Sequence, residues 1–564
     1  MSVQRLALVA SLVLAGTLAG AMVCRHAADK ASAQTAASID AEVLEDTAGG
    51  RTGHFLVVLV PQADTHQAAA AARNFEARGH SVVEALQWEA KASQPAVRAA
   101  LDALDALGAR YRAYWIVNAF AVEGSRAVVE AMAARPDVAA IESDRAFRAD
   151  LERPTAGATT AAPLASPAIE WNVSWINAPA MWAQGYTGQG QILANADTGV
   201  RWEHPALKSH YRGWNGSTAD HNYNWWDAIH SDISGNGSNP CGFSSPVPCD
   251  DNGHGTHTTG TAVGDDGAGN QVGVAPGASW IACRNMDENV GRPSTYIECM
   301  QFFTAPTDLN GQNPDPNRRP HAVGNSYVCP SVELCEAHSL QTALENLRTA
   351  GVFMAVSAGN SGPGCSTIDS PPALEDSAIT VGATGFQTDD IASYSSRGPV
   401  TVDGSNRRKP DLVAPGSGVR SSYPPASYAT LSGTSMAAPH VAGAVLLLWS
   451  ALPQLSRAVD YTEFVLGQTA VQLTSDQGCG GDSSSQVPNN VYGHGRIDVL
   501  AVYDYASQSA PVGGIAELPQ LELDPTTGSG EAAIPCTVAV AVVVAGVVVV
   551  AAGAWYARRW WLGR

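Results

Sequence analysis

The chain has 564 residues, a formal net charge of −20, and 45% hydrophobic residues. This length accommodates two or three domains, and the composition is compatible with a large packed α/β core. The acidic balance excludes nucleic acid and argues against an anionic membrane surface as a partner, because both would repel such a chain.

Residues 1–33 are typical of a secretory signal peptide, since Arg5 precedes an apolar stretch over residues 6–23 and small residues follow. A retained signal anchor is the alternative, because the apolar stretch is long. Eight of the ten cysteines lie between Cys241 and Cys479, and none forms a paired zinc pattern. Together with the export signal they predict disulfides in an oxidising compartment, with the pairing left open.

Residues 34–150 predict a small α+β domain. We expect a strand at 54–60, helices near 67–78 and 94–107, a strand pair over 111–122, a helix at 126–134 and a closing segment at 136–144. Residues 151–167 are rich in Ala, Thr and Pro, which indicates a linker with a processing site.

Residues 168–507 predict the large domain. Expected strands at 191–196, 278–283 and 352–358 and a helix at 339–349 suggest alternating elements. Such alternation favours an α/β fold with a doubly wound parallel sheet and helices on both faces. Sites on these sheets gather at the carboxyl ends of the strands, where Asp197 and Asn360 fall.

Small residues surround Ser435, and the apolar run 441–449 follows at once. The run is too short to span a membrane and predicts a buried helix. With Thr434 as its N-cap, Ser435 would lie at the helix N-terminus, beside unpaired backbone N–H donors. An ordinary small-residue helix start is the alternative.

The C-terminal part predicts a stalk at 508–535, a transmembrane helix at 536–557 and a cytoplasmic tail at 558–564. The apolar run is long enough to cross a bilayer, and Arg558 and Arg559 follow it. The large domain would then be membrane-anchored and extracellular. A lipid-anchor signal whose apolar tail is removed remains the alternative.

Asp197, His254 and Ser435 occur in the order that one class of catalytic triad uses. Nucleophilic serine catalysis needs a base to take the hydroxyl proton and an acid to orient that base. Each motif has a plainer interpretation, such as a turn at Asp197 or a metal site formed by His254 and His257. The joint occurrence favours catalysis.

The chain resembles the subtilisin-like serine endopeptidases, or subtilases, most closely those of the bacillopeptidase F type. The stretches that carry the resemblance are 171–179, 188–190, 204–207, 220–227, 273–278, 395–399 and 409–416. It implies that Ser435 is the nucleophile, His254 the general base, Asp197 its orienting acid and Asn360 an oxyanion-hole donor. It also implies protein or peptide substrates, a zymogen, and an inhibitory propeptide at 34–150.

The resemblance places Ser326 and Val328 on the substrate-lining strand, where the family usually has Gly at the position of Val328. Specificity is therefore not transferred. No cofactor is required, and the 264–267 loop offers either a structural calcium site or a solvated turn. The alternative function is a catalytically dead cell-surface binding protein on the same scaffold.

Overall fold

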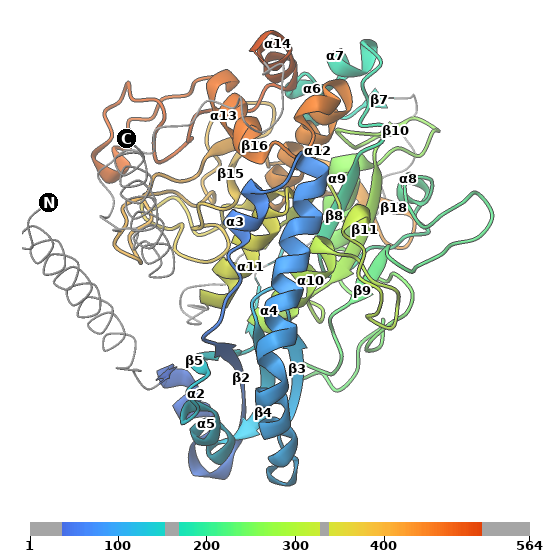
Figure 1. The fold of residues 1–564 in the computed structure, drawn as a ribbon. Coiled ribbons are helices and arrows are strands. Elements are labelled where there is room, and N and C mark those ends of the chain that lie inside the picture. Colours follow the sequence, from blue (N-terminus) through green and yellow to red (C-terminus); the bar gives the residue numbers. More distant parts are fainter. Residues whose placement is uncertain (1–36, 150, 153–167, 328–337, 510–564) are drawn as a thin grey trace, which may run out of the picture. The chain divides into compact units, whose positions relative to one another are not determined.

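The computed structural model describes residues 37–149, 151–152, 168–327 and 338–509 (Figure 1). The predicted signal peptide, stalk, membrane helix and cytoplasmic tail lie outside these residues, as does most of the predicted linker. They stay predictions.

The N-terminal segment, residues 37–149, forms a five-stranded sheet. Its order is β1 (Ser38–Ile39), β5 (Val138–Ser143), β2 (Thr52–Leu59), β4 (Ala119–Ser125) and β3 (Arg110–Tyr114). All neighbours are antiparallel except the β1–β5 pair. Along β2, Phe55 and Val57 enter the segment's own core, whereas Leu56 packs in a cluster with the large domain. One sheet face is therefore a docking surface.

The helices of this segment differ in part from the prediction. The segment contains α2 (Ala41–Asp46), α3 (Thr65–Ala70) and α5 (Arg126–Ala133). It also contains one long helix, α4 (Phe75–Ala103), which joins the end of the predicted helix at 67–78 to most of the predicted helix at 94–107 (Figure 1). The boundary was wrong because Val82, Val83 and Leu86 are also buried, which continues the helical apolar face across the gap.

The large domain contains a seven-stranded parallel sheet, which confirms the predicted fold class. Its order is β16 (Leu412–Pro415), β15 (Ile379–Thr384), β14 (Phe353–Ser357), β13 (Ala322–Asn325), β8 (Ile192–Asp197), β11 (Ser279–Arg284) and β9 (Trp225–Asp227). Phe353 and Ala355 of β14 join one buried cluster, and Met354 and Val356 join the other. Both faces are thus buried, as expected for parallel strands.

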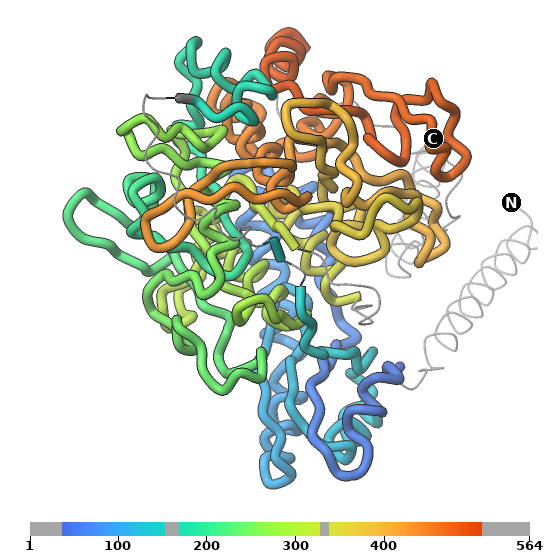
Figure 2. Tube along the Cα trace, turned by 180° about the vertical axis from the view of Figure 1, so that it is seen from behind, coloured from blue at the N-terminus to red at the C-terminus, as the bar shows by residue number. Residues whose placement is uncertain are grey.

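Helices cover both faces of this sheet. The larger cluster contains residues of α12 (Thr434–Ala451) and α9 (His254–Val263), and the other contains residues of α10 (Pro293–Thr304) and α11 (His338–Thr349). From behind, the chain runs from the N-terminal segment at the lower end into the large domain above (Figure 2).

Smaller elements complete the described chain. Three two-stranded pairs join β7 (Ala168–Ile169) to β10 (Asn270–Gln271), β6 (Phe147–Arg148) to β12 (Val290–Gly291), and β17 (Val419–Tyr423) to β18 (Ser427–Leu431). The remaining α-helices are α6 (Trp171–Trp175), α7 (Ala178–Ala183), α8 (Pro205–Lys208), α13 (Val459–Thr469) and α14 (Val499–Ser509).

The helix α12 is the core helix that the apolar run predicted. It is long and apolar enough to cross a membrane, yet 89% of it is buried inside the protein. Its N-cap is Gly433, so the expectation that Thr434 would cap it was wrong. Ser435 nonetheless lies in the first turn, where the backbone N–H groups are unpaired within the helix.

Among the described residues of the large domain, three disulfides form: Cys241–Cys249, Cys283–Cys299 and Cys365–Cys479. The first closes a short loop eight residues apart, whereas the third joins segments 114 residues apart. A cross-link over so long a loop restricts the unfolded chain most. The predicted disulfide-bonded character of the domain is confirmed.

Candidate active site

Asp197 and His254 meet at the carboxyl end of β8. Asp197 is the last residue of that strand, and His254 is the first residue of α9. His254 Nδ1 lies 2.8 Å from Asp197 Oδ1, and both side chains are fully buried. The backbone N–H of Thr198 also donates to Asp197 Oδ1, over 2.8 Å. The carboxylate is thus fixed against one imidazole nitrogen.

The electrostatics of His254 follow from its two acidic neighbours. Burial lowers the pKa of His254, but Asp197 and, to a smaller extent, Glu152 raise it, with a net increase to about 10. The imidazole is therefore protonated at neutral pH in this form of the chain.

His257, one turn further along α9, has the opposite environment. Burial and the neighbouring His254 lower its pKa to about 3, and its Nε2 lies 3.2 and 3.1 Å from the carbonyl oxygens of Val419 and Ala429. His254 and His257 thus have separate partners, which argues against the alternative of a shared metal site. Among the described residues no group of three or more His, Cys, Asp or Glu side chains could hold a metal ion.

Ser435 faces the carboxyl end of β13. Its Oγ donates to the carbonyl oxygen of Ser326 over 2.8 Å, and Ser326 Oγ donates back to the carbonyl oxygen of Ser435 over 3.1 Å. Both serines are buried. The two residues that sequence reasoning assigned to separate roles are therefore directly bonded. Val328, the other predicted substrate-binding residue, lies outside the described residues.

Asn360 follows β14 and lies against the start of α12. Its Oδ1 accepts from the backbone N–H and the hydroxyl of Thr434, over 2.9 and 3.0 Å. These bonds leave the side-chain amide Nδ2 directed toward Glu152 Oε1, 2.8 Å away. A side chain from another element thus satisfies one of the unpaired N–H groups of α12.

Glu152 fills the space between these groups, and sequence reasoning missed it. Its Oε2 lies 3.0 Å from His254 Nε2 while its Oε1 accepts from Asn360. A Cβ added to Gly433 would lie 1.6 Å from Glu152 Oε1, so the carboxylate rests directly on that glycine. The signal available in the sequence was an acidic residue just beyond the last strand of the predicted propeptide.

Asp250 is a second residue that was missed. Its Oδ1 accepts from the backbone N–H groups of Asn252 and Gly253, over 3.0 and 2.7 Å, and its Oδ2 accepts from that of Thr256 over 2.8 Å. Gly253, with φ of 102°, adopts the left-handed conformation directly before His254. Asp250 therefore holds the turn that delivers His254 to Asp197. An acidic residue four positions before the histidine was the available signal.

The tail of the N-terminal segment enters this site along β12. The strand β6 pairs with β12 in antiparallel register, Arg148 opposite Val290 and Phe147 opposite Gly291. The Phe147 ring packs on Tyr296, with ring centroids 5.4 Å apart. The chain therefore approaches His254 as an extended strand.

Two buried acids of the same segment bind helix N-termini of the large domain. Asp144 Oδ1 accepts from the N–H of Ser294 in α10 over 2.8 Å, and Glu142 Oε2 accepts from the N–H and hydroxyl of Ser339 in α11 over 3.2 and 2.7 Å. Burial raises the pKa of both acids. Helix N-termini favour such negative partners.

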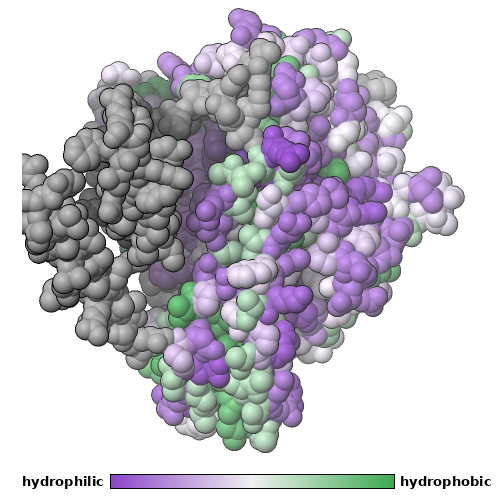
Figure 3. Space-filling view, viewed as in Figure 1, coloured by the Kyte–Doolittle hydropathy of each residue, from purple (hydrophilic) through white to green (hydrophobic). Residues whose placement is uncertain are grey.

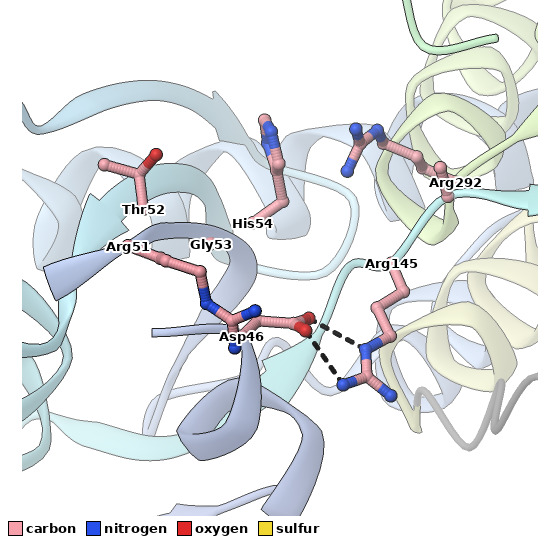
Figure 4. A pocket seen from close by; sticks show the side chains of 8 residues that line it. Asp46, Arg51, Thr52, Gly53, His54, Arg145 and Arg292 are labelled. Carbon is pink, nitrogen blue, oxygen red and sulfur yellow. Dashed lines mark hydrogen bonds and ion pairs between the residues drawn. The ribbon is translucent and has the colours of Figure 1, made fainter. Parts of the chain in front are cut away.

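A cavity of about 270 Å³ lies at the same seam, lined by Arg51, His54, Arg145 and Arg292 among others (Figure 4). Arg145 binds Asp46 over 2.8 Å, and Arg292 donates to the carbonyl oxygen of Asp144 over 2.9 Å. Burial and Arg292 lower the pKa of His54 to about 4. The cationic lining is therefore already bonded to the protein and joins the segment to the large domain.

The candidate calcium loop, residues 264–267, has one carboxylate that the protein itself engages. Asp266 Oδ1 accepts from the N–H groups of Ala268 and Asn270, and Oδ2 accepts from Asn270 Nδ2 and the Tyr428 hydroxyl. These donors would compete with a calcium ion for Asp266. The solvated-turn alternative is the better description of residues 264–267.

Outside the site, hydrophilic side chains cover most of the large-domain face in Figure 3, and apolar side chains gather toward the lower end, over the N-terminal segment. The exposed large apolar residues of the N-terminal segment include Trp88 and Leu107.

Comparison with known proteins agrees with this geometry. The model of the subtilase family matches residues 188–495 of the 564, which is more than half of the chain. Bacillopeptidase F of Bacillus subtilis (strain 168) is 36% identical over 457 residues, covering 78% of this chain and 30% of that protein.

Two shorter relatives are covered more fully. The alkaline protease of Alkalihalobacillus alcalophilus is 28% identical over 386 residues, or 68% of this chain and 79% of the relative. Subtilisin Savinase of Lederbergia lenta is 29% identical over 334 residues, or 59% and 98%. The chain thus spans less than a third of Bacillopeptidase F but most of these two proteases. It belongs to the subtilase family of serine-type endopeptidases.

Proposed function

We propose that this chain hydrolyses peptide bonds in proteins or peptides through an acyl-enzyme formed on Ser435, and that it is made as a zymogen. One observation carries the proposal: a single carboxylate, that of Glu152, is held by both His254 Nε2 and Asn360 Nδ2. Acyl transfer needs a base and an oxyanion donor on either side of one reacting carbonyl, and the bonds of these two groups to one carboxylate support that assignment.

In the proposed reaction, Ser435 Oγ attacks the substrate carbonyl carbon while His254 Nε2 takes the hydroxyl proton. The carbonyl electrons move to the oxygen, which accepts from Asn360 Nδ2 and the backbone N–H of Ser435. His254 then gives its proton to the leaving amine as the C–N bond breaks. Water repeats the sequence on the ester, and Asp197 stabilises the protonated imidazole throughout.

In this proposal the uncut chain cuts peptide bonds only slowly, because Glu152 engages both His254 and Asn360. Its carboxylate occupies Nε2 of His254, and with Asp197 it keeps that imidazole protonated, so that no base faces Ser435. The Ser435 hydroxyl donates to Ser326 instead. Residues 34–150, the intramolecular inhibitor of this proposal, dock the tail that carries Glu152, and cleavage near Glu152 would release them.

The rival is a binding protein on a dead protease scaffold. A fluorophosphonate probe reacts only with an activated serine, so we expect it to label the processed protein and not Ser435→Ala. An absence of labelling in processed wild-type protein would reject the proposed enzymatic activity and favour the binding protein.

Self-processing is a separate step with its own test. Purified full-length chain should lose its N-terminal segment by cleavage within residues 151–167, and Ser435→Ala should stay intact. Cleavage of purified Ser435→Ala at the same rate would show that another protease makes the cut.

Membrane anchoring completes the proposal and rests on the sequence of residues 536–557. We propose an exported protein whose catalytic domain is extracellular and held by this span. Deletion of residues 537–564 should release the protein into the medium. Full-length protein already present in the soluble fraction would contradict the anchor.

A further inference from the structure

Asn289 lies in a rigid turn that precedes β12. The backbone N–H groups of Asp287 and Val290 each donate to the other residue's carbonyl oxygen, over 2.8 and 2.9 Å, which closes the turn. The fully buried Asp287 accepts from the N–H groups of Ile233 and Ser234, over 3.0 and 2.9 Å. The turn that carries Asn289 is therefore bonded to residues of the large domain, independently of the tail.

This asparagine bonds the entering tail in both directions. The N–H of Ala149 donates to the carbonyl oxygen of Asn289 over 2.7 Å, and Asn289 Nδ2 donates to the carbonyl oxygen of Ala149 over 2.9 Å. Arg148 Nη1 donates to Asn289 Oδ1 over 2.6 Å, which fixes the orientation of the amide. One residue thus binds both backbone polar groups of Ala149.

We infer that Asn289 is a substrate-binding residue whose side-chain amide donates to the backbone carbonyl of the substrate residue at the Ala149 position. The inference rests on the proposed function, because it takes the tail as the guide to how a substrate lies. The strand pairing of β6 with β12 supplies contacts that any residue in the turn could make through its backbone. The Nδ2 bond is additional and needs an asparagine-like donor here.

The expected consequence is tighter binding of extended peptides regardless of their side chain at the Ala149 position, since every residue has the carbonyl. A neutral amide–carbonyl bond of this kind changes affinity by roughly 3- to 10-fold. The Oδ1 atom adds a preference for arginine at the preceding position, where Arg148 lies.

The test compares substrate and enzyme changes in one cycle. The probe is an internally quenched peptide with residues 146–153, and its partner has the Ala149 carbonyl replaced by thiocarbonyl, a weak acceptor. With self-processed wild-type enzyme, the thioamide should raise KM, or Ki if the peptide is not cut, roughly 3- to 10-fold. With Asn289→Ala the two peptides should bind alike, because the donor is already absent. An equal thioamide penalty in both enzymes would overturn the inference.

Two further variants separate the loss of the Asn289 Nδ2 donor from a change in the structure of the turn. Asn289→Asp keeps the size but cannot donate, so it should weaken binding as much as Asn289→Ala while binding arginine peptides relatively better. Asn236→Ala removes the hydrogen bond of 3.0 Å that Asn236 donates to Glu288, the residue before Asn289 in the turn. Because this bond does not involve the tail, the variant should change KM by no more than about twofold. Comparable losses in Asn236→Ala and Asn289→Ala would assign the effect to the turn.

Hydrogen exchange in the uncut chain needs no activity. In full-length Ser435→Ala, the Ala149 amide should exchange roughly 3- to 10-fold faster once Asn289→Ala is added, whereas Asn236→Ala leaves it unchanged. Unchanged exchange overturns the inference. A wild-type protein that fails to label with fluorophosphonate rejects the proposed function instead, and leaves the exchange result to decide on Asn289.

Discussion

Two carboxylates bind the same histidine from opposite regions of the molecule. Asp197 belongs to the central sheet of the large domain and reaches Nδ1 of His254, whereas Glu152 follows the N-terminal segment and reaches Nε2. Asp197 is completely buried, and the Glu152 side chain keeps 10% of its surface exposed. The chemistry of the two contacts is alike, but their connection to the fold is not.

That difference separates a permanent partner from a removable one. Asp197 is held by β8 and by Thr198, so it remains when the chain is cut. Glu152 is held by a short strand pair and by the groups it blocks, so cleavage nearby frees it. In the proposed mechanism, the carboxylate on Nδ1 therefore supports catalysis, whereas the one on Nε2 prevents it.

The largest effect should come from breaking the permanent contact. Asp197→Asn is isosteric but no longer holds the imidazole in the required tautomer or stabilises its charge. We expect self-processing of the full-length chain to slow by about 10⁴-fold. The time course of cleavage in purified protein measures it, and thermal unfolding checks that the variant is folded. A loss below about tenfold would remove Asp197 from the mechanism.

Raising the pH should weaken the removable contact. His254 has its pKa raised from 6.5 to about 10 in the uncut chain, so the stabilisation from its bound proton is full below pH 6.5 and is lost as the pH rises through about 10. Because neutral imidazole is the base, self-processing should accelerate by up to about tenfold per pH unit from 7 toward 10.

The control for this profile is Ser435→Ala, which reports any cleavage that does not use the site. Circular dichroism at each pH confirms that the chain stays folded. A flat profile between pH 7 and 10 would show that protonation of His254 does not limit the uncut chain.

Asn360 bonds the other oxygen of the Glu152 carboxylate, and its substitution tests the proposed oxyanion donor. Asn360→Ala should lower kcat of the processed enzyme by about 10²- to 10³-fold, because one oxyanion donor is lost. Asn360→Asp keeps an acceptor for Thr434 yet lacks the donor, so it should lose at least as much. A smaller loss in Asn360→Asp would assign the effect to the start of α12 instead.

The sequence predicted the surroundings of Asp197, the permanent partner of His254, better than those of Glu152, the removable one. Parallel strands buried on both faces gave clear apolar runs, and Asp197 and Asn360 could be placed at strand ends from those runs alone. Ser435 could be placed at a helix start because a long apolar run followed it. These are local patterns, and the fold follows them.

Glu152 and Asn289 escaped because nothing local distinguishes them. Glu152 is 102 residues from His254 in sequence, and its role comes from where β6 delivers it. Asn289 stands in a turn whose function depends on the tail opposite. The long helix α4 was divided for a related reason: its central turns are buried by tertiary packing, which a search for separate alanine-rich stretches does not detect.

The smallest expected effect comes from a variant that tests the contact between Glu152 and His254 directly. Glu152→Gln keeps the size of the side chain and an oxygen that can accept from Asn360 Nδ2, but removes the charge that faces His254. Bonds to charged groups contribute more than neutral ones, so self-processing at pH 7 should accelerate roughly 10- to 100-fold. The pH at which processing reaches half its maximal rate should also fall, because one of the two carboxylates that raise the pKa of His254 is gone. Glu123→Gln, an exposed acid on β4, is the matched control and should change neither quantity. If Glu152→Gln slows processing instead, the carboxylate positions the tail for cutting rather than blocking the base, and the two contacts on His254 would then serve the same reaction.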